Sequence, residues 1–304
     1  MLAAYDPQSG TLEPTKRPAG TGWIDATHPT KSECAWLGEL GVPAEMITDA
    51  LDSEELSRVH HDTTGARLFV LRVPTKEALD FAVIPLSVVT LPSGLVVTIS
   101  TADTGLPTLL AGAKVAPSMN HRFSFLLAEE VASRFVATLH TIEADIERLS
   151  KRIQASLEND EIMALLGHQK KLVFLDFALS ANVGVLERAR DDKGFELTEE
   201  DRELVEGVLV ETRQAHAMTR TKKELLGETM DALATVVSNN LNVAMKKIAS
   251  LTLLASVPAI IAGIFGMNVP MPISAAPWSF FAILVFAAGC TAALAAYLRA
   301  QKWV

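Results

Sequence analysis

The stretch IASLTLLASVPAIIAGIFGMNVPMPISAAPWSFFAILVFAAGCTAALAAYL, residues 248–298, contains no Asp, Glu, Lys or Arg and decides the fold of the chain. A helix that crosses a bilayer needs about 20 apolar residues. The stretch offers two such segments, at about 248–267 and 278–298, separated by a short proline-rich loop. We therefore predict two transmembrane helices. Two buried helices of a soluble protein are the alternative, but such helices rarely lack charge throughout.

The charges on either side of this stretch predict its orientation. Lys246 and Lys247 precede the first span, Arg299 and Lys302 follow the second, and the loop between the spans has no charge. Lys and Arg are in excess on the cytoplasmic side of membrane spans. We therefore expect a multi-pass protein of the cell (inner) membrane with both termini in the cytoplasm.

The composition of the whole chain argues against several classes of function. The chain has 304 residues and a net charge of -9, whereas nucleic-acid binding requires basic patches. The two cysteines, Cys34 and Cys290, lack the spacing of a zinc or redox motif. The sequence also has no glycine-rich phosphate loop and no nucleophile motif. We therefore expect neither a nucleic-acid partner nor an enzyme.

Residues 1–113 are expected to form a cytoplasmic α/β domain. Segments rich in Val, Ile and Phe predict strands at 21–27, 67–74, 81–91 and 95–100. Two segments with helical spacing follow the first strand, and Thr30 or Ser32 is the candidate N-cap of the first. His60, His61 and Asp62 fall in an apparent loop, where solvated side chains are more common than metal ligands.

Residues 114–247 are expected to form a helical cytoplasmic domain. Apolar residues recur every three or four positions from Leu126 to Ile153, and a second helix is predicted at about 161–190. A third helix begins at Thr198, with Asp201 in the position of a capping box. It has no strong stop signal before Gly266, so it would run about 100 Å into the first span. A helix of that length needs neighbouring helices.

Small and polar residues form a stripe along this long helix. Positions seven apart lie on nearly the same helix face. The stripe consists of Asp231, Thr235, Ser238, Asn242, Met245, Ala249, Thr252, Ser256, Ala259, Gly263 and Gly266. In a membrane, such a face either packs closely against another helix or lines a polar cavity. A pore would require several copies of the chain, because two spans cannot enclose one.

Asn268 lies where the first apolar segment ends, at the expected outer mouth of such a pore. Mg²⁺ dehydrates reluctantly, and a ring of neutral amide oxygens can hold the hydrated ion without trapping it. Asn is also suited to capping a helix C-terminus. Both roles are compatible.

These residues resemble the CorA family of magnesium transporters. Gly266-Met267-Asn268 is similar to the family's GMN signature, and SNNLNVAMKKIASLTLLASVPAIIAGIFGMN (238–268) is similar to its first membrane helix. WIDATHPT (23–30) and KWV (302–304) resemble its N-terminal and C-terminal segments. The resemblance implies a homopentameric divalent-cation channel in the lipid bilayer, most simply for Mg²⁺. Its fold would be an α/β N-terminal domain, a long helical stalk and two C-terminal transmembrane helices (residues 248–304), arranged as a pentameric funnel.

The resemblance also implies roles for individual residues. Gly266, Met267 and Asn268 would form the selectivity filter. The pore-lining residues would be Asn242, Met245, Ala249, Thr252, Ser256, Ala259 and Gly263. Asp231 on the stalk and Asp49 on the N-terminal domain would bind a regulatory metal between subunits. Bound Mg²⁺ would then favour the closed state.

Three features depart from the family pattern. Phe265 stands where a Tyr is usual, the loop VPMPISAAP (269–277) has no acidic residue, and the C-terminal end has only Arg299 and Lys302 as basic residues. The zinc-transporting branch of the family also ends its first span in GMN. Transport of Zn²⁺, Co²⁺ or Ni²⁺ is therefore one alternative. A family-related metal-sensing membrane scaffold that conducts poorly is another.

Overall fold

The computed structural model describes residues 2–8, 11–15, 22–76, 81–106, 121–155, 159–192, 195, 197–267 and 278–303. The chain divides into two compact units, Met1–Leu226 and Gly227–Val304. Helix α6 (Glu199–Phe265) runs through the boundary between them. The fold class predicted from the sequence is confirmed in its order of elements: an α/β region, long helices, and apolar helical segments at the C-terminal end.

A seven-stranded sheet forms the core of the first unit, with strand order β2-β1-β3-β7-β6-β5-β4. The strands are β1 (Leu2–Gln8), β2 (Thr11–Thr15), β3 (Trp23–Thr27), β4 (Val59–His61), β5 (Arg67–Lys76), β6 (Phe81–Thr90) and β7 (Val96–Ser100). β3 and β7 pair in parallel, whereas the other neighbouring strands are antiparallel. The four strands predicted from the sequence correspond to β3, β5, β6 and β7.

The sequence did not predict three of these strands. β1 and β2 form a hairpin, and β4 is a strand of three residues that pairs with β5. The expectation that His60 and His61 lie in a loop is therefore wrong. β4 is short, and β1 and β2 contain Pro, Asp, Ala and Glu, which are depleted in strands, so their composition gives little strand signal.

Helices cover both faces of the sheet. Alternate residues of a strand point to opposite faces. Ile24 and Val97 belong to the core cluster that also contains residues of α1 (Lys31–Glu39) and α2 (Ala44–Ala50). On the other face, the Trp23 ring lies 5.1 Å from the Phe123 ring of α4 (His121–Ala155).

The N-cap of α1 is Thr30, one of the two candidates. Its side-chain oxygen accepts a hydrogen bond from Glu33 N, and the Glu33 carboxylate accepts one from Thr30 N at 2.7 Å. Leu37 of α1 and Met46 of α2 are buried against the sheet. Both predicted helices of this region are therefore present, and the capping box explains the start of α1.

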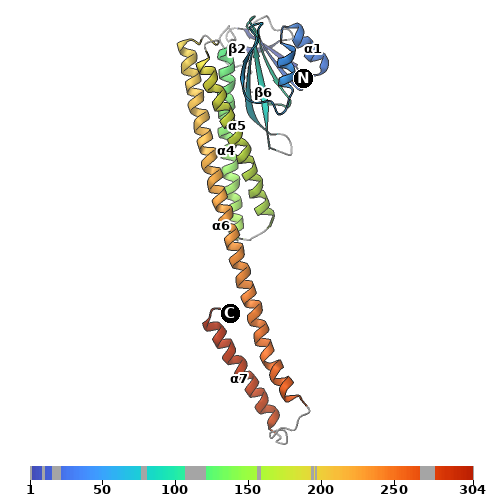
Figure 1. Ribbon diagram of the computed structural model, residues 1–304, viewed down its shortest axis with the longest axis vertical. Coiled ribbons are helices and arrows are strands. Elements are labelled where there is room, and N and C mark those ends of the chain that lie inside the picture. Colours follow the sequence, from blue (N-terminus) through green and yellow to red (C-terminus); the bar gives the residue numbers. More distant parts are fainter. Residues whose placement is uncertain are drawn as a thin grey trace. The chain divides into compact units, whose positions relative to one another are not determined.

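In the first unit, α4, α5 (Asn159–Asp191) and the first part of α6 run side by side (Figure 1). α5 begins at Asn159, two residues before the predicted start. Asn182 of α5 attaches the bundle to the sheet: its Oδ1 accepts from Arg72 N and its Nδ2 donates to Arg72 O, each at 2.8 Å. One amide thereby satisfies both backbone groups of a residue in β5.

The second unit contains the rest of α6 and α7 (Ser279–Ala300). Both helices contain a segment long and apolar enough to cross a membrane, as the sequence predicted. Pro258 lies inside α6 without ending it. α6 therefore continues through the first expected span and stops at Phe265.

Candidate ion pathway

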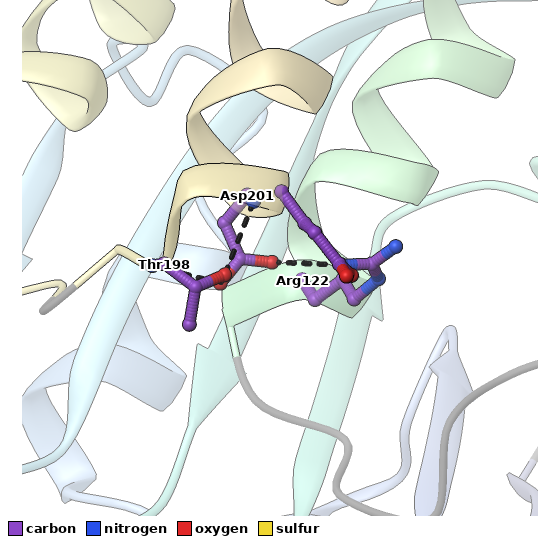
Figure 2. A network of polar contacts seen from close by, with 4 residues as sticks. Arg122, Thr198 and Asp201 are labelled. Carbon is purple, nitrogen blue, oxygen red and sulfur yellow. Dashed lines mark hydrogen bonds and ion pairs between the residues drawn. The ribbon is translucent and has the colours of Figure 1, made fainter.

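α6 begins at a capping box that also binds α4. Thr198 Oγ1 accepts a hydrogen bond from Asp201 N at 3.2 Å, and Asp201 Oδ2 accepts from Thr198 N and Oγ1 (Figure 2). Arg122 Nη1 of α4 donates to Asp201 Oδ1 at 3.2 Å. Desolvation acts to raise the pKa of Asp201, but the hydrogen bonds from Thr198 and the charge of Arg122 outweigh it and lower the pKa overall. The first turn of α6 is thus anchored by a charged carboxylate.

Two adjacent lysines hold α6 where it is about to leave the bundle. Lys222 Nζ lies 2.5 Å from Glu143 Oε1 of α4, and Lys223 Nζ pairs with Asp176 of α5. The hydrogen bond from Lys222 lowers the pKa of Glu143. Leu226, three residues later, is the last residue of the first unit and is buried. Ion pairs with both α4 and α5 therefore fix α6 at the end of the first unit.

Part of α6 beyond this point has little cover from the described part of the chain. Every residue from Ala234 to Ala249 is exposed. Large apolar side chains are among them: Val236, Val237, Leu241, Val243, Met245 and Ile248 are 43–63% exposed. Contiguous apolar surface of this kind indicates an interaction site. This segment is therefore a candidate interaction surface.

Three hydroxyl groups of the stripe donate to the backbone of their own helix. Thr235 Oγ1 donates to Asp231 O at 3.1 Å, Thr252 Oγ1 to Ile248 O at 2.9 Å, and Ser256 Oγ to Thr252 O at 2.7 Å. Each hydroxyl has one proton and two lone pairs. Because the proton is directed to the backbone, the oxygen lone pairs remain for a ligand. Such a surface suits a cation or the water around it.

The stripe and α7 lie on different sides of α6. A groove of about 930 Å³ separates the two helices, and from α6 it is lined by Leu254, Pro258, Ile261, Ala262, Phe265 and Gly266. At about 100° per residue, this face and the stripe point in roughly opposite directions and share only Gly266. Ser250 and Ile261, which are buried in the second unit, lie on the groove side. The stripe is therefore not covered by the chain's own α7.

Gly266 ends α6 in a geometry that excludes a side chain. Its N–H donates to Ala262 O at 2.8 Å, and a Cβ at this position would lie 2.9 Å from the same oxygen. Real Cβ atoms essentially never approach so closely. Met267 is 59% exposed, and Asn268 lies outside the described residues. A Cβ added at Gly263 would meet no described atom within 4 Å.

The two aspartates expected to bind a regulatory metal belong to different units. Asp231 is exposed on α6. Asp49, in α2, has its Oδ2 only 2.5 Å from Arg58 Nη2. Within the described ranges, no three His, Cys, Asp or Glu side chains are grouped so that they could hold a metal. A metal at Asp49 would therefore need ligands from elsewhere, and Asp49 is already paired with a cation.

His61 contacts other residues of the chain and is not the solvated loop side chain that was expected. Its Nε2 lies 2.5 Å from Asp192 Oδ2. Its ring packs edge-on against the Phe195 ring, with 5.7 Å between the ring centroids. Asp62 accepts a hydrogen bond from Thr64 Oγ1 at 2.7 Å, which lowers the pKa of Asp62. These residues stabilise the turn after β4 and connect β4 with the segment between α5 and α6.

Comparison with known proteins gives the same architecture. A family model described as "CorA-like Mg2+ transporter protein" matches residues 18–300. The "Cobalt/magnesium transport protein CorA" of Methanocaldococcus jannaschii is 26% identical over 291 residues, which are 93% of this chain and 91% of that protein.

Solved structures show similarity over the full length. The complete structure of the CorA magnesium transporter from M. jannaschii has a TM-score of 0.85 and 22% identity, covering 100% of this chain and 99% of that one. The full-length CmaX protein has a TM-score of 0.68 and 15% identity, covering 99% and 97%. An α/β N-terminal domain, a long helical stalk and two apolar C-terminal helices are therefore a shared fold.

Proposed function

The chain belongs to the CorA-like Mg²⁺ transporter family, and from this premise we propose a homopentameric channel that carries hydrated Mg²⁺ across the membrane. Membership makes the chain a divalent-cation transporter rather than an enzyme, and a membrane protein with two C-terminal spans. The ion, the number of copies, the gating and the residue roles are our proposal.

The observation that carries the proposal is the position of the stripe on α6, on the side away from α7. A pathway needs a polar face that the chain itself leaves free. Asn242, Met245, Ala249, Thr252, Ser256, Ala259 and Gly263 lie on that face, and we assign them to the pore lining. The hydroxyls of Thr252 and Ser256 support this assignment, because each donates its proton to the backbone and keeps its oxygen lone pairs as acceptors.

Several copies are needed to enclose the pathway, because one chain has two spans. The exposed apolar residues of α6 between Val236 and Ile248 would be covered by the same residues of neighbouring copies. We propose five copies, the number that the resemblance to the family implies. We further propose cytoplasmic regions at 1–113 and 114–247, a transmembrane region at 248–304, and both termini in the cytoplasm.

Selectivity is assigned to Gly266, Met267 and Asn268. Gly266 is required by the close approach to Ala262 O, and Asn268 follows it by two residues. Neutral amide oxygens would bind the water shell of Mg²⁺ loosely enough for conduction. The membrane potential would supply the driving force, about 4.6 kcal/mol for a divalent ion at 100 mV.

Regulation is assigned to Asp231 and Asp49 as ligands of a cytoplasmic Mg²⁺ between subunits. Asp231 is exposed on the stalk, and the Asp49 side chain is 23% exposed. An ion that binds only the closed arrangement would stabilise it, which amounts to negative feedback. Asp231→Ala should therefore weaken inhibition by internal Mg²⁺.

Metal uptake into proteoliposomes tests the proposal. We expect Mg²⁺ flux from the full-length protein and a large loss with Asn268→Ala, with Leu251→Ala as a control on an exposed apolar position of α6. Parallel assays with Co²⁺, Ni²⁺ and Zn²⁺ determine the ion. If no ion crosses and Asn268→Ala changes nothing, the chain is a metal-sensing scaffold and the channel proposal is wrong.

A further inference from the structure

A cation that belongs to the chain itself occupies the acidic end of α2. Arg58 Nη2 lies 2.5 Å from Asp49 Oδ2, and Arg58 Nε lies 2.9 Å from Glu55 Oε1. The Asp49 and Glu55 side chains are 23% and 13% exposed. One guanidinium thus neutralises two carboxylates that are both partly shielded from water.

The segment that carries Arg58 is held in place by Arg72 of β5. Arg72 Nη2 donates to Glu55 O at 2.8 Å and to Glu54 O at 3.3 Å. The backbone of Arg72 is bonded on both sides by Asn182 of α5. Arg58 is therefore presented to Asp49 by a segment bonded to the sheet and, through it, to the helical bundle. A positioned partner loses less conformational entropy on pairing than a free surface side chain.

The guanidinium nevertheless has few directional contacts with these carboxylates. Its contact with Glu55 has the distance of an ion pair but not the geometry of a hydrogen bond, since Arg58 Nε makes no hydrogen bond in the described part of the chain. The hydrogen bond to Asp49 Oδ2 is thus its main directional contact with these carboxylates. The Arg58 side chain is 37% exposed, so water can replace that contact.

We propose that Arg58 is a tethered competitor of the regulatory cation at Asp49. The inference rests on the proposed regulatory role of Asp49. A divalent cation and a guanidinium at one carboxylate repel each other, so the ion binds more tightly after Arg58 has moved away. The residue thereby raises the Mg²⁺ concentration at which the site fills, and Arg72 acts as its positioning residue.

The test is the Mg²⁺ dependence of thermal stability, measured on the full-length protein in detergent. The readout is the Mg²⁺ concentration that gives half of the increase in Tm, because a ligand that binds the folded state stabilises it. We expect Arg58→Gln to lower this midpoint about two- to fivefold, the range for a partly exposed ion pair. Arg58→Lys should stay near the wild type because it keeps the charge.

Arg213→Gln is the matched control, because Arg213 also pairs at 2.5 Å, with Glu187, in a contact between helices of the bundle. It should leave the midpoint unchanged. Asp49→Asn should abolish the part of the Mg²⁺-dependent increase in Tm that comes from this site. The double variant Asp49→Asn with Arg58→Gln should then show the same Mg²⁺ dependence as Asp49→Asn alone.

An unchanged or higher midpoint in Arg58→Gln overturns the inference, as does a shift that persists in the Asp49→Asn background. Flux assays separate this result from the channel proposal. Normal Mg²⁺ flux with no shift in Arg58→Gln refutes the competitor alone. A shift without any flux refutes the channel and leaves the competitor standing.

Discussion

The two parts of α6 differ in what covers them. In the first unit, Val205 and Leu209 are buried in the bundle, and Lys222 and Lys223 pair with carboxylates of α4 and α5. From Ala234 to Ala249 the same helix is exposed on every side. The first part is a structure that the chain completes by itself. The second part exposes apolar side chains, which in the proposed assembly would be covered by the membrane and by further copies.

The largest effect is expected where the uncovered part of α6 ends. Gly266→Ala would place a Cβ 2.9 Å from Ala262 O, so the end of α6 would have to shift, and overpacking of this kind costs on the order of 1–3 kcal/mol. We expect Mg²⁺ uptake in proteoliposomes to fall about tenfold or more. Gly289→Ala in α7 is the control, because its Cβ would meet no described atom within 4 Å. Equal flux in the two variants would contradict a structural role for Gly266.

A charge on the uncovered part should separate the copies. Leu241, 63% exposed in the single chain, would be buried between copies in the proposed assembly. Leu241→Asp should convert the oligomer to smaller species, because an unpaired buried charge costs about 3–5 kcal/mol. Mass measurement in detergent reads out the change. Val210→Asp is the control, at a position in the first unit that is 59% exposed, and it should keep the wild-type mass. Dissociation of this variant as well would contradict the proposed difference between the two parts of α6.

A smaller effect is expected at the covered start of α6. Thr198→Ala removes the N-cap and should lower the free energy of unfolding by about 1 kcal/mol. Thr221→Ala, which loses only a bond to Ala217 O, should change it less. Equilibrium denaturation measures both variants, and equal losses would contradict the importance of the cap.

The cap also predicts a pH dependence. The pKa of Asp201 is lowered in the folded state, so its contribution is present above the unfolded value and is lost as the pH falls through the folded value. Thr198→Ala should therefore reduce the acid sensitivity of unfolding. A pH profile parallel to that of the wild type would contradict this coupling.

The smallest effect is expected inside the sheet. Burial, partly offset by hydrogen bonds from Thr98 and Thr27, raises the pKa of Asp25 above its usual 3.8. For an acid shifted upward, stability is highest below the unfolded pKa and declines as the pH rises through the folded pKa. Asp25→Asn should remove this decline from the pH profile of unfolding. A slope that persists in the variant would assign it to another group.

The sequence predicted the parts of the molecule that local signals determine. The uncharged run from Ile248 to Leu298 predicted both apolar helices, and the pair Thr198 and Asp201 predicted the start of α6. Each signal lies within one element. The strand pattern of β5, β6 and β7 is likewise local, because alternation and composition suffice to identify it.

Contacts between distant residues could not be predicted. Asn182 and Arg72 are 110 positions apart, and His61 and Asp192 are 131 apart. Nothing in the sequence around either member points to its partner, because the sheet and the bundle bring them together only in the folded chain. For the pathway, the seven-residue spacing predicted the stripe, but its position opposite the groove required the placement of α7.

The most direct test of the pathway is thiol accessibility on two sides of α6. In a background with Cys34 and Cys290 replaced by Ser, Ser256→Cys would lie on the stripe and Leu254→Cys in the groove beside α7. These neighbouring positions point in roughly opposite directions. We predict that a charged, water-soluble thiol reagent blocks Mg²⁺ flux through Ser256→Cys and leaves Leu254→Cys conducting. Block through Leu254→Cys with Ser256→Cys unaffected would contradict the account.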